Sequence, residues 1–445
     1  MDEPISPNTN LRPRDRIGLS AHYFFIFAAL GFVATFLPLF LRDRGLTLTQ
    51  IGALSAILAL AGAGTQVPLG MLSDRIGRRK PLVIGGGLIL GGLYLLLGRI
   101  QSFPGFCTLY FAIGTLFFTI ATLTNALISD WTAGTRSTGR NFGITRIWGS
   151  LGFIASLVVA SVVPKVSESG NLLPAITVLY WIGALSIIPV TEPERRRHEP
   201  QPILKDLPKL LGNAKLGLFL ATFLLYRICE NGGISFLSIY LRNLDASRSL
   251  IALAFAFNAL VEIPFMVWVG GASDRIGRRP PLVIAFLTNP LRLFLYSLLV
   301  RPADVFFVQL FHGLTFSFAL VGSLAFVADL SPGRLRATGQ GLLNMVSALA
   351  MAAGPFLGGL VADRTSISAM YVWLAAIALT GGIVFLLFVR ESHPELSAER
   401  LAARISSRHP LLRPVVRILS QPLLGRAGGL RQEERDSEGT GRVGL

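Results

Sequence analysis

Long, uninterrupted apolar runs dominate the order of polar and apolar residues along the chain. The hydrocarbon core of a bilayer is about 30 Å thick, so roughly 20 helical residues are needed to cross it. Twelve runs of about this length lie at 17–41, 49–70, 81–99, 105–128, 142–163, 172–190, 216–241, 249–269, 281–300, 303–327, 339–361 and 369–389. The pattern predicts an all-α integral membrane protein with twelve transmembrane helices.

One heptapeptide recurs at a fixed distance along the chain. The residues SDRIGRR occupy positions 73–79 and again 273–279, and the tetrapeptide PLVI follows at 81–84 and at 281–284. An identity of this length at a single offset indicates an internal repeat. Each copy follows the second apolar run of its set of six, so the sequence predicts two pseudo-symmetric six-helix bundles. Repeated halves of this kind are a common design of secondary transporters.

The repeat and the polar segments around it define the expected domain organisation. We expect an N-terminal tail at 1–16, a first bundle at 17–190, a linker at 191–215, a second bundle at 216–390 and a basic tail at 391–445.

Composition supports the membrane class and excludes others. Hydrophobic residues make up 52% of the chain and charged residues only 15%, and the mean hydropathy is +0.58. This is too little charge for the surface of a soluble protein of this size. The net charge of +16 resides in short arginine clusters between apolar runs, which argues against nucleic acid as a partner. Both cysteines, Cys107 and Cys229, lie within apolar runs, so neither a disulfide framework nor a metal site is expected.

The basic residues orient the helices. If the termini and the even-numbered loops face the cytoplasm, that side carries 20 Lys or Arg residues against 8 on the other side, without counting the C-terminal tail. Positive charge favours the cytoplasmic side. We therefore expect a multi-pass protein of the cell membrane with both termini in the cytoplasm.

The repeated motif has the chemistry of a gate. Its glycines allow close helix approach, its acid can accept hydrogen bonds at a helix N-terminus, and its arginines can pair with carboxylates on neighbouring helices. We expect such a cluster to hold the cytoplasmic ends of the two bundles together. The residues are Gly70, Asp74, Arg75, Gly77, Arg78 and Arg79, with their counterparts Gly270, Asp274, Arg275, Gly277, Arg278 and Arg279.

On these residues the chain resembles the major facilitator superfamily, whose signature Gly-x-x-x-Asp-Arg-x-Gly-Arg-Arg it carries twice. The resemblance covers about residues 17–390 and implies the major facilitator fold. Asp130 and Asp329 lie where the fourth and tenth helices end. They are candidate partners for the motif arginines, with ordinary helix-end charges as the alternative.

Few charged residues lie inside the helices, and each costs about 2.5–3.5 kcal/mol at the bilayer centre, so each marks a functional candidate. Arg227 and Glu230 are three residues apart and can neutralise each other on one helix face. Glu230 therefore has two readings, a structural ion pair or a substrate contact. Glu262 follows Asn258 by four residues and has no partner on its own helix, so it can carry a proton.

A narrower resemblance, to the lactose permease and phenylpropionate permease branch, rests on the fifth, ninth and tenth helices. The stretch RIWGSLGF at 146–153 and the tetrapeptide HGLT at 312–315 are similar to that branch, and Arg292 precedes His312 by the same twenty residues. The resemblance implies that Arg146 anchors the substrate, while Arg292 and His312 form a proton-coupling cluster with Glu262. Lactose permease has a glutamate where this chain has Thr315, which favours a small organic anion over a sugar.

The sequence thus predicts a secondary transporter that moves a small solute by alternating access, coupled to protons, as a monomer in the lipid bilayer. Arg146, Glu230 and Asn258 are the candidate substrate contacts. An exporter of apolar or cationic compounds is the alternative within transport, and a non-transporting sensor or scaffold is the alternative outside it. No phosphate-binding loop, metal-ligand spacing or nucleophile arrangement is present, so neither an enzyme nor a cofactor is expected.

Overall fold

A computed structural model describes residues 13–76, 78–132, 138–191, 210, 212–331 and 333–392. Within these ranges the first half of the chain forms long helices joined by short turns. They are α1 (Pro13–Asp43), α2 (Leu48–Ile76), α3 (Lys80–Leu97), α4 (Phe103–Thr132), α5 (Thr138–Val162) and α6 (Ser169–Leu185), with a 3₁₀ turn at Pro164–Ser167. Most of the expected tails and linker lie outside the described residues.

The second half repeats this order. Its helices are α8 (Ala214–Asn243), α9 (Arg248–Ile276), α10 (Arg279–Ser297), α11 (Val305–Gln309), α12 (Phe318–Leu330), α13 (Arg336–Arg364) and α14 (Ile367–Phe388), with 3₁₀ turns at Pro302–Asp304 and Gly333–Leu335. A π-helical turn, η3 (Gly313–Ser317), joins α11 to α12. The three pieces occupy the single apolar segment Pro302–Leu330. This segment corresponds to the tenth expected run, and it is called the tenth helix below, to be distinguished from α10.

Every apolar run found in the sequence coincides with a helix among the described residues. Nine helical segments are long and apolar enough to cross a membrane by length and composition. Of the others, α6 is apolar but only 17 residues long, while α8 and α10 each carry charged residues. These charged residues lower the mean hydropathy of α8 and α10, so the two helices are less apolar than the other nine although they coincide with apolar runs of the sequence.

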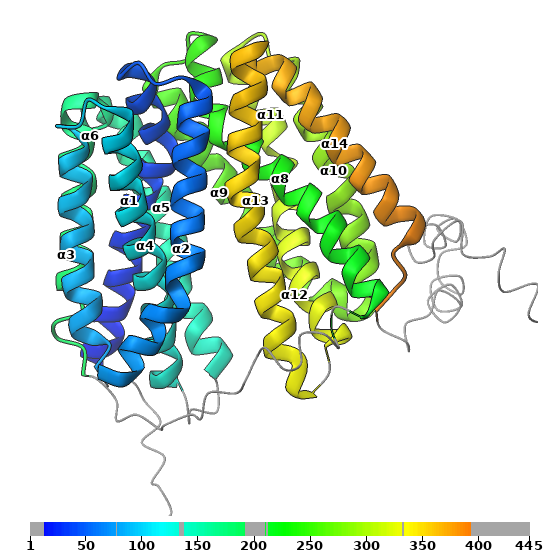
Figure 1. Ribbon diagram of the computed structural model, residues 1–445, viewed down its shortest axis with the longest axis horizontal. Coiled ribbons are helices and arrows are strands. Elements are labelled where there is room, and N and C mark those ends of the chain that lie inside the picture. The colour runs from blue at the N-terminus through cyan, green and yellow to red at the C-terminus, as the bar shows by residue number, and fades with distance from the viewer. Residues whose placement is uncertain are drawn as a thin grey trace, which may run out of the picture.

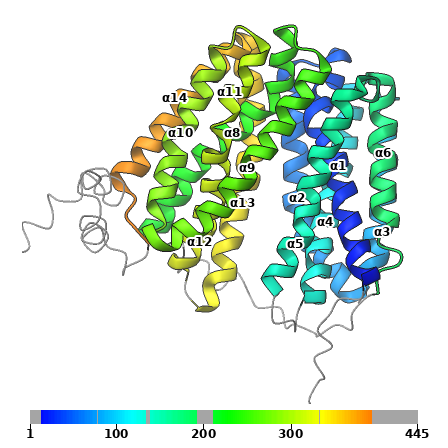
Figure 2. The same ribbon diagram turned by 180° about the vertical axis from the view of Figure 1, so that it is seen from behind.

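The helices form two bundles that stand side by side, with the first half of the chain in one and the second half in the other (Figures 1 and 2). In the first, α1 packs on α5 and α6, and α3 packs on α6. In the second, α8 packs on α13 and α14, and α10 packs on α14. The two bundles meet mainly where α2 packs on α13 and α5 packs on α9.

We call the end of the molecule where α1 begins and α14 ends the terminal face, and the other end the opposite face. At the opposite face the bundles touch directly. The carboxylate of Asp363 on α13 accepts hydrogen bonds from the backbone N–H groups of Leu48 (3.0 Å) and Thr49 (2.7 Å) at the start of α2. Arg248 at the start of α9 pairs with Asp43 at the end of α1, with 3.5 Å between Nη2 and Oδ2.

Glycines bring α2 and α13 unusually close near the opposite face. A Cβ atom on Gly52 would lie 2.2 Å from the carbonyl oxygen of Pro355, and one on Gly359 would lie 2.3 Å from that of Leu48. Only residues without a side chain fit at such distances. The bundles are therefore closed at this face.

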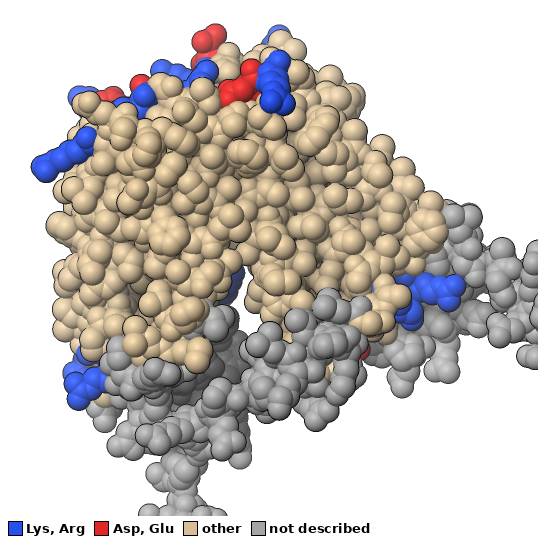
Figure 3. All heavy atoms as spheres, in the orientation of Figure 1, with Lys and Arg blue, Asp and Glu red and all other residues tan. Residues whose placement is uncertain are grey.

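At the terminal face the bundles separate. The space-filling view shows a notch between them that opens toward this face, with a basic side chain in its wall (Figure 3). Apart from that side chain, the same view shows a belt free of Lys, Arg, Asp and Glu between two charged ends, the arrangement expected of a membrane-spanning surface. The structure is thus open at the terminal face and closed at the opposite one.

Candidate functional site

A cavity of about 220 Å³ lies within the first bundle and carries Arg146 in its wall. Arg146 is exposed, and the described residues offer it no ion-pair partner within 4 Å. Tyr23 on α1 donates a hydrogen bond to Oδ1 of Asn125 on α4 (2.5 Å), and its ring stacks on that of Phe27. The remaining lining residues are His22, Ile26, Leu30, Leu90, Phe117, Ile120, Ala121, Thr124 and Tyr180.

His22 has a structural role in this wall. Its Nδ1 lies 2.7 Å from the carbonyl oxygen of Gly183 and must donate to it, and its Nε2 lies 3.0 Å from the hydroxyl of Thr124. Both ring nitrogens are therefore satisfied, and the ring ties α1 to α4 and α6. Such a histidine orients its neighbours and is not a proton carrier.

In the second bundle, Arg227 and Glu230 form the ion pair on α8 that their spacing predicted. Glu230 is only 7% exposed, and its Oε1 is buried without a hydrogen-bond partner among the described atoms. The pair supports the structural reading of Glu230, while the unsatisfied oxygen leaves one acceptor for a bound solute or water.

Glu262 on α9 faces His312 across the helix interface. The distance between its Oε2 and Nε2 of His312 is 3.8 Å, and Ser317 donates to the backbone carbonyl of Glu262 (3.1 Å). Nδ1 of His312 is buried without a described partner. Two of the three expected coupling residues are therefore neighbours.

Arg292, the third, has its own set of hydrogen-bond partners. Its guanidinium donates to Thr315 (3.1 Å), Tyr296 (3.1 Å) and Gln309 (3.3 Å). Arg292 is 4% exposed, and all these acceptors are neutral. A buried guanidinium needs acceptors, and side chains one turn along α10 and on the tenth helix supply them. Its charge also acts on His312.

Tyr296 and Gln309 were missed from the sequence, although a signal existed. Tyr296 follows Arg292 by four residues and Gln309 precedes His312 by three, so each shares a helix face with a candidate residue. The tyrosine hydroxyl also donates to Oε1 of Gln309 (2.9 Å), which closes the network.

The π-helical turn η3 shapes this region. A Cβ atom on Gly313 would lie 2.1 Å from the ring of Phe265, so the tenth helix and α9 approach closely there. A π turn holds an extra residue, and such turns concentrate at functional sites. Here the turn contains both Thr315, which binds Arg292, and Ser317, which binds the backbone of Glu262.

The two bundles contribute to one site because α5 packs on α9. Arg146 and Glu262 lie close enough to interact electrostatically. Asn258, one helical turn before Glu262, has its side-chain oxygen buried without a partner among the described atoms. The site therefore brings an arginine from one half within electrostatic range of an acid from the other.

The proposed gate is only partly within the described side chains. Those of Asp74, Arg75, Asp130, Asp274 and Arg275, and all of Gly77, lie outside them. The expected pairing of Arg278 with Asp329 is present, with 3.3 Å between Nε and Oδ2.

This ion pair joins α10 to the end of α12 within one bundle, so it does not hold the halves together in this conformation. A Cβ atom on Gly70 or Gly270 would meet nothing within 4 Å. The expectation that these glycines admit a neighbouring helix is therefore not met here, because the bundles are apart at this face.

Comparison with known proteins places the chain among transporters. A family model described as the MFS_1 like family matches residues 16–375. The maltose permease of Geobacillus stearothermophilus is 26% identical over 385 residues, covering 83% of this chain and 93% of that protein. The putative nucleoside transporter YegT of Escherichia coli (strain K12) is 23% identical over 415 residues, covering 83% and 93%. The crystal structure of the nucleoside transporter NupG aligns with a TM-score of 0.74 at 16% identity, covering 83% of this chain and 98% of that chain.

Proposed function

This chain belongs to the MFS_1 like family of the major facilitator superfamily, and we propose that it is a proton-coupled secondary transporter of a small organic anion. Its relatives are transporters of small solutes, and membership makes it a multi-pass membrane protein. We assign the terminal face to the cytoplasm, which makes the described conformation inward-open. Alternating access then requires the reciprocal state, open at the opposite face.

The observation that carries the proposal is the cross-bundle cluster of Arg146, Glu262 and His312. Glu262 lies 3.8 Å from the imidazole of His312, which can be neutral or protonated, and Glu230 on α8 also acts on it electrostatically. Arginine stays charged, so Arg146 can bind an anion but cannot carry the proton. Because the two residues belong to opposite bundles, rocking of the bundles changes their separation. When Glu262 is protonated, Arg146 is free to bind the anionic substrate. Proton binding and substrate binding are thereby coupled.

The cavity beside Arg146 supports a solute with a ring and a polar group. The stacked rings of Tyr23 and Phe27 lie 5.8 Å apart between centroids and present an apolar wall. Asn125 and Arg146 supply hydrogen-bonding groups at the same cavity. An aromatic carboxylate, the substrate class of the phenylpropionate-type branch, has both features.

A neutral sugar or nucleoside is the second candidate. It is favoured by the relatives named maltose permease and putative nucleoside transporter. Purified protein in proteoliposomes would be tested with labelled aromatic acids, sugars and nucleosides, with and without a pH gradient. We expect an aromatic acid to accumulate only with the gradient, and accumulation of a sugar or nucleoside instead would replace the anion proposal.

Arg146→Lys tests the anchor. Lysine keeps the charge but loses the planar, two-pronged contact with a carboxylate. Loss of one charge-assisted hydrogen bond is worth about 1.5–3 kcal/mol, so kcat/KM for uptake should fall about tenfold or more. Arg99→Lys, at the opposite face, is the matched control and should leave uptake unchanged. Equal activity of Arg146→Lys and wild type would remove Arg146 from the substrate site.

Topology is tested by labelling introduced cysteines with an impermeant reagent in intact cells. Cysteines at positions 42–45 should be labelled from outside, and those at 195–199 only after permeabilisation, because the basic residues favour a cytoplasmic terminal face. The reverse pattern would invert the assignment of the two faces.

A further inference from the structure

The cavity that carries Arg146 runs into the interior of the first bundle. Its mouth is marked by three exposed residues, Ala121, Asn125 and Arg146. Its rear is formed by side chains that are almost fully buried, namely His22, Leu90, Thr124 and Tyr180. A cavity of about 150 Å³ holds a benzene molecule, so the 220 Å³ available here has room for one aromatic ring with its substituents. A ligand whose charge binds Arg146 therefore directs the other end of its ring toward the rear wall.

The rear wall contains hydrogen bonds of fixed direction. Nδ1 of His22 donates to the carbonyl oxygen of Gly183 (2.7 Å), because a carbonyl can only accept. An almost fully buried imidazole favours its neutral form, since a buried charge is costly, and the second nitrogen of a neutral ring is an acceptor. The hydroxyl of Thr124 therefore donates to Nε2 of His22 (3.0 Å). Its oxygen keeps lone pairs and can accept a hydrogen bond from a ligand.

The mouth of the cavity has the opposite polarity. Tyr23 donates to Oδ1 of Asn125 (2.5 Å), so the amide NH₂ group is the part of Asn125 that can serve a ligand. This NH₂ group and the guanidinium of Arg146 are both donors. The mouth therefore suits a carboxylate, which accepts, while the rear suits a hydroxyl or N–H group, which donates.

The two polar pairs lie side by side along the same two helices. His22 and Tyr23 are consecutive on α1, and their partners Thr124 and Asn125 are consecutive on α4. Consecutive side chains of an α-helix point about 100° apart, which places one pair in the rear wall and the other at the mouth. A single aromatic ring between the two pairs can therefore contact both.

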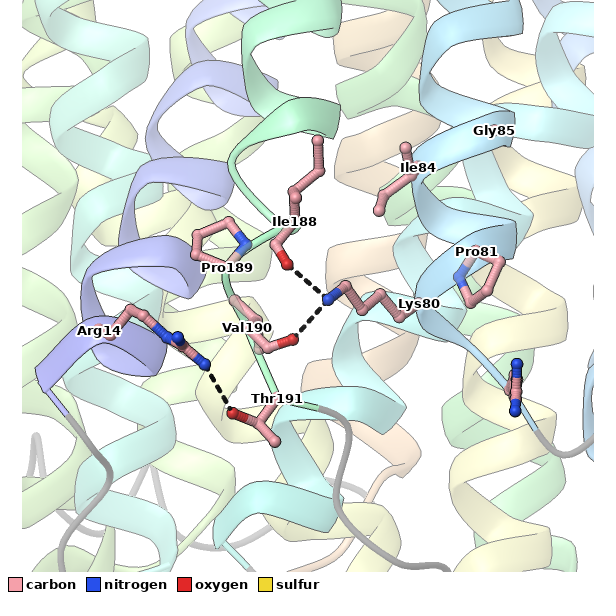
Figure 4. A pocket seen from close by; sticks show the side chains of 10 residues that line it. Arg14, Lys80, Pro81, Ile84, Gly85, Ile188, Pro189, Val190 and Thr191 are labelled. Atoms are coloured by element: carbon pink, nitrogen blue, oxygen red, sulfur yellow. Dashed lines mark hydrogen bonds between the residues drawn. The ribbon is translucent and has the colours of Figure 1, made fainter.

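The helices behind the rear wall are tied together. Lys80 at the start of α3 donates to the carbonyls of Ile188 (2.5 Å) and Val190 (2.8 Å) beyond α6, as Figure 4 shows for the terminal face. Farther along the same two helices, Thr177 donates to the carbonyl of Gly91 (2.8 Å). The rear wall is thus held in place before a ligand enters, and a preformed wall spares the ligand the cost of ordering it.

We propose that the transported anion carries a ring hydroxyl at the end away from its carboxylate, and that Thr124 selects for this donor. The substrate class is then a hydroxylated aromatic carboxylate. Its carboxylate binds Arg146 and Asn125, and its hydroxyl donates to the oxygen of Thr124. The carboxylate end of this inference rests on the proposed function, whereas the donor end rests on Thr124 and His22. A site built around an acceptor discriminates against a ligand that lacks the donor, because the acceptor is then left unpaired.

The test measures equilibrium binding to the purified full-length protein in nanodiscs by titration calorimetry. The ligands are phenylpropionate, its meta- and para-hydroxylated derivatives, and the fluorinated analogue of each hydroxylated acid. Fluorine is close to a hydroxyl in size but donates no hydrogen bond. One hydroxylated acid should bind about fivefold more tightly than its fluorinated analogue, the value of one hydrogen bond. Equal affinities within both pairs would overturn the proposal.

Thr124→Val removes the acceptor at nearly constant volume, and the affinity ratio should fall to about one. Thr124→Ser restores the hydroxyl and should keep the ratio. Thr119→Val is the matched control, because Thr119 is a buried threonine of the same helix that donates to the carbonyl of Thr115 (2.6 Å) and does not line the cavity. It should bind with the wild-type ratio. Thr124→Ala removes the same oxygen and takes the place of Thr124→Val if the loss of the donor to His22 prevents that variant from folding.

A ratio that persists without the Thr124 hydroxyl, or that falls equally in Thr119→Val, would overturn the inference. Tighter binding of a formyl derivative, which only accepts, than of the hydroxylated acid would reverse the assigned polarity and overturn it as well. The inference and the proposed function fail separately. If the acids bind without preference for the hydroxyl, the anion proposal stands and the selection by Thr124 falls. If no acid binds, but a nucleoside binds and loses affinity in Thr124→Val and not in Thr119→Val, the anion proposal falls and the selection of a donor by Thr124 stands.

Discussion

Glu262→Gln is expected to abolish pH-driven accumulation of the substrate while leaving exchange across the membrane intact. Glutamine cannot take up a proton, so the variant has no means of coupling solute movement to the gradient. Each pH unit supplies about 1.4 kcal/mol per coupled proton, or about tenfold accumulation, and this gain should disappear completely. Exchange at equal concentrations requires no net proton movement and should continue. Both quantities are measured in the same proteoliposomes.

Glu230→Gln is the matched control because it removes the other deep carboxylate. It should lower the amount of folded protein, since Arg227 loses its buried partner, but the accumulation ratio of the folded protein should persist. If Glu230→Gln alone lost pH-driven accumulation and Glu262→Gln behaved as wild type, the proton site would move to α8.

Asp363→Ala is expected to shift the protein toward states open at the opposite face. The carboxylate caps the N-terminus of α2 from the other bundle, and this contact forms only when that face is closed. Removing a helix cap costs about 1 kcal/mol, so the ratio of open to closed states should rise about fivefold. Spin labels at Ser102 and Ala303, in loops of the two halves at this face, should report a larger population of long distances.

Asp363→Asn should give a smaller shift, because its amide can still accept one of the two hydrogen bonds. Asp245→Asn is the charge control: Asp245 is exposed near the same face and has positive φ, which asparagine tolerates. No change in the label distances for Asp363→Ala, or an equal change for Asp245→Asn, would show that the cap does not govern closure.

Local and repeated features could be predicted from the sequence. The hydrophobic runs located the helices to within a few residues, and the spacing of Arg227 and Glu230 predicted their ion pair. The pseudo-symmetry of the halves made Asp329 one candidate partner of the motif arginines, and it pairs with Arg278.

Contacts between helices far apart in the chain could not be predicted in the same way. Asp363 caps α2 across 314 residues, and nothing in either segment alone indicates the other. Arg292 was grouped with Glu262 and His312 because of the resemblance to the lactose permease branch. Which acceptors Arg292 meets depends on how α10 is rotated relative to the segment Pro302–Leu330. That rotation depends on the π turn within the segment, and the π turn has no simple sequence signature.

The π turn Gly313–Ser317 makes the length of the tenth helix a property of the site. An α-helix advances about 100° per residue, so the one surplus residue sets the angular register between the segment that ends at His312 and the segment that begins at Phe318. Deleting a single residue here would restore a regular helix yet turn one segment away from its partners, while a conservative substitution would preserve the register. In this helix, insertions and deletions should therefore be less tolerated than exchanges of side chain.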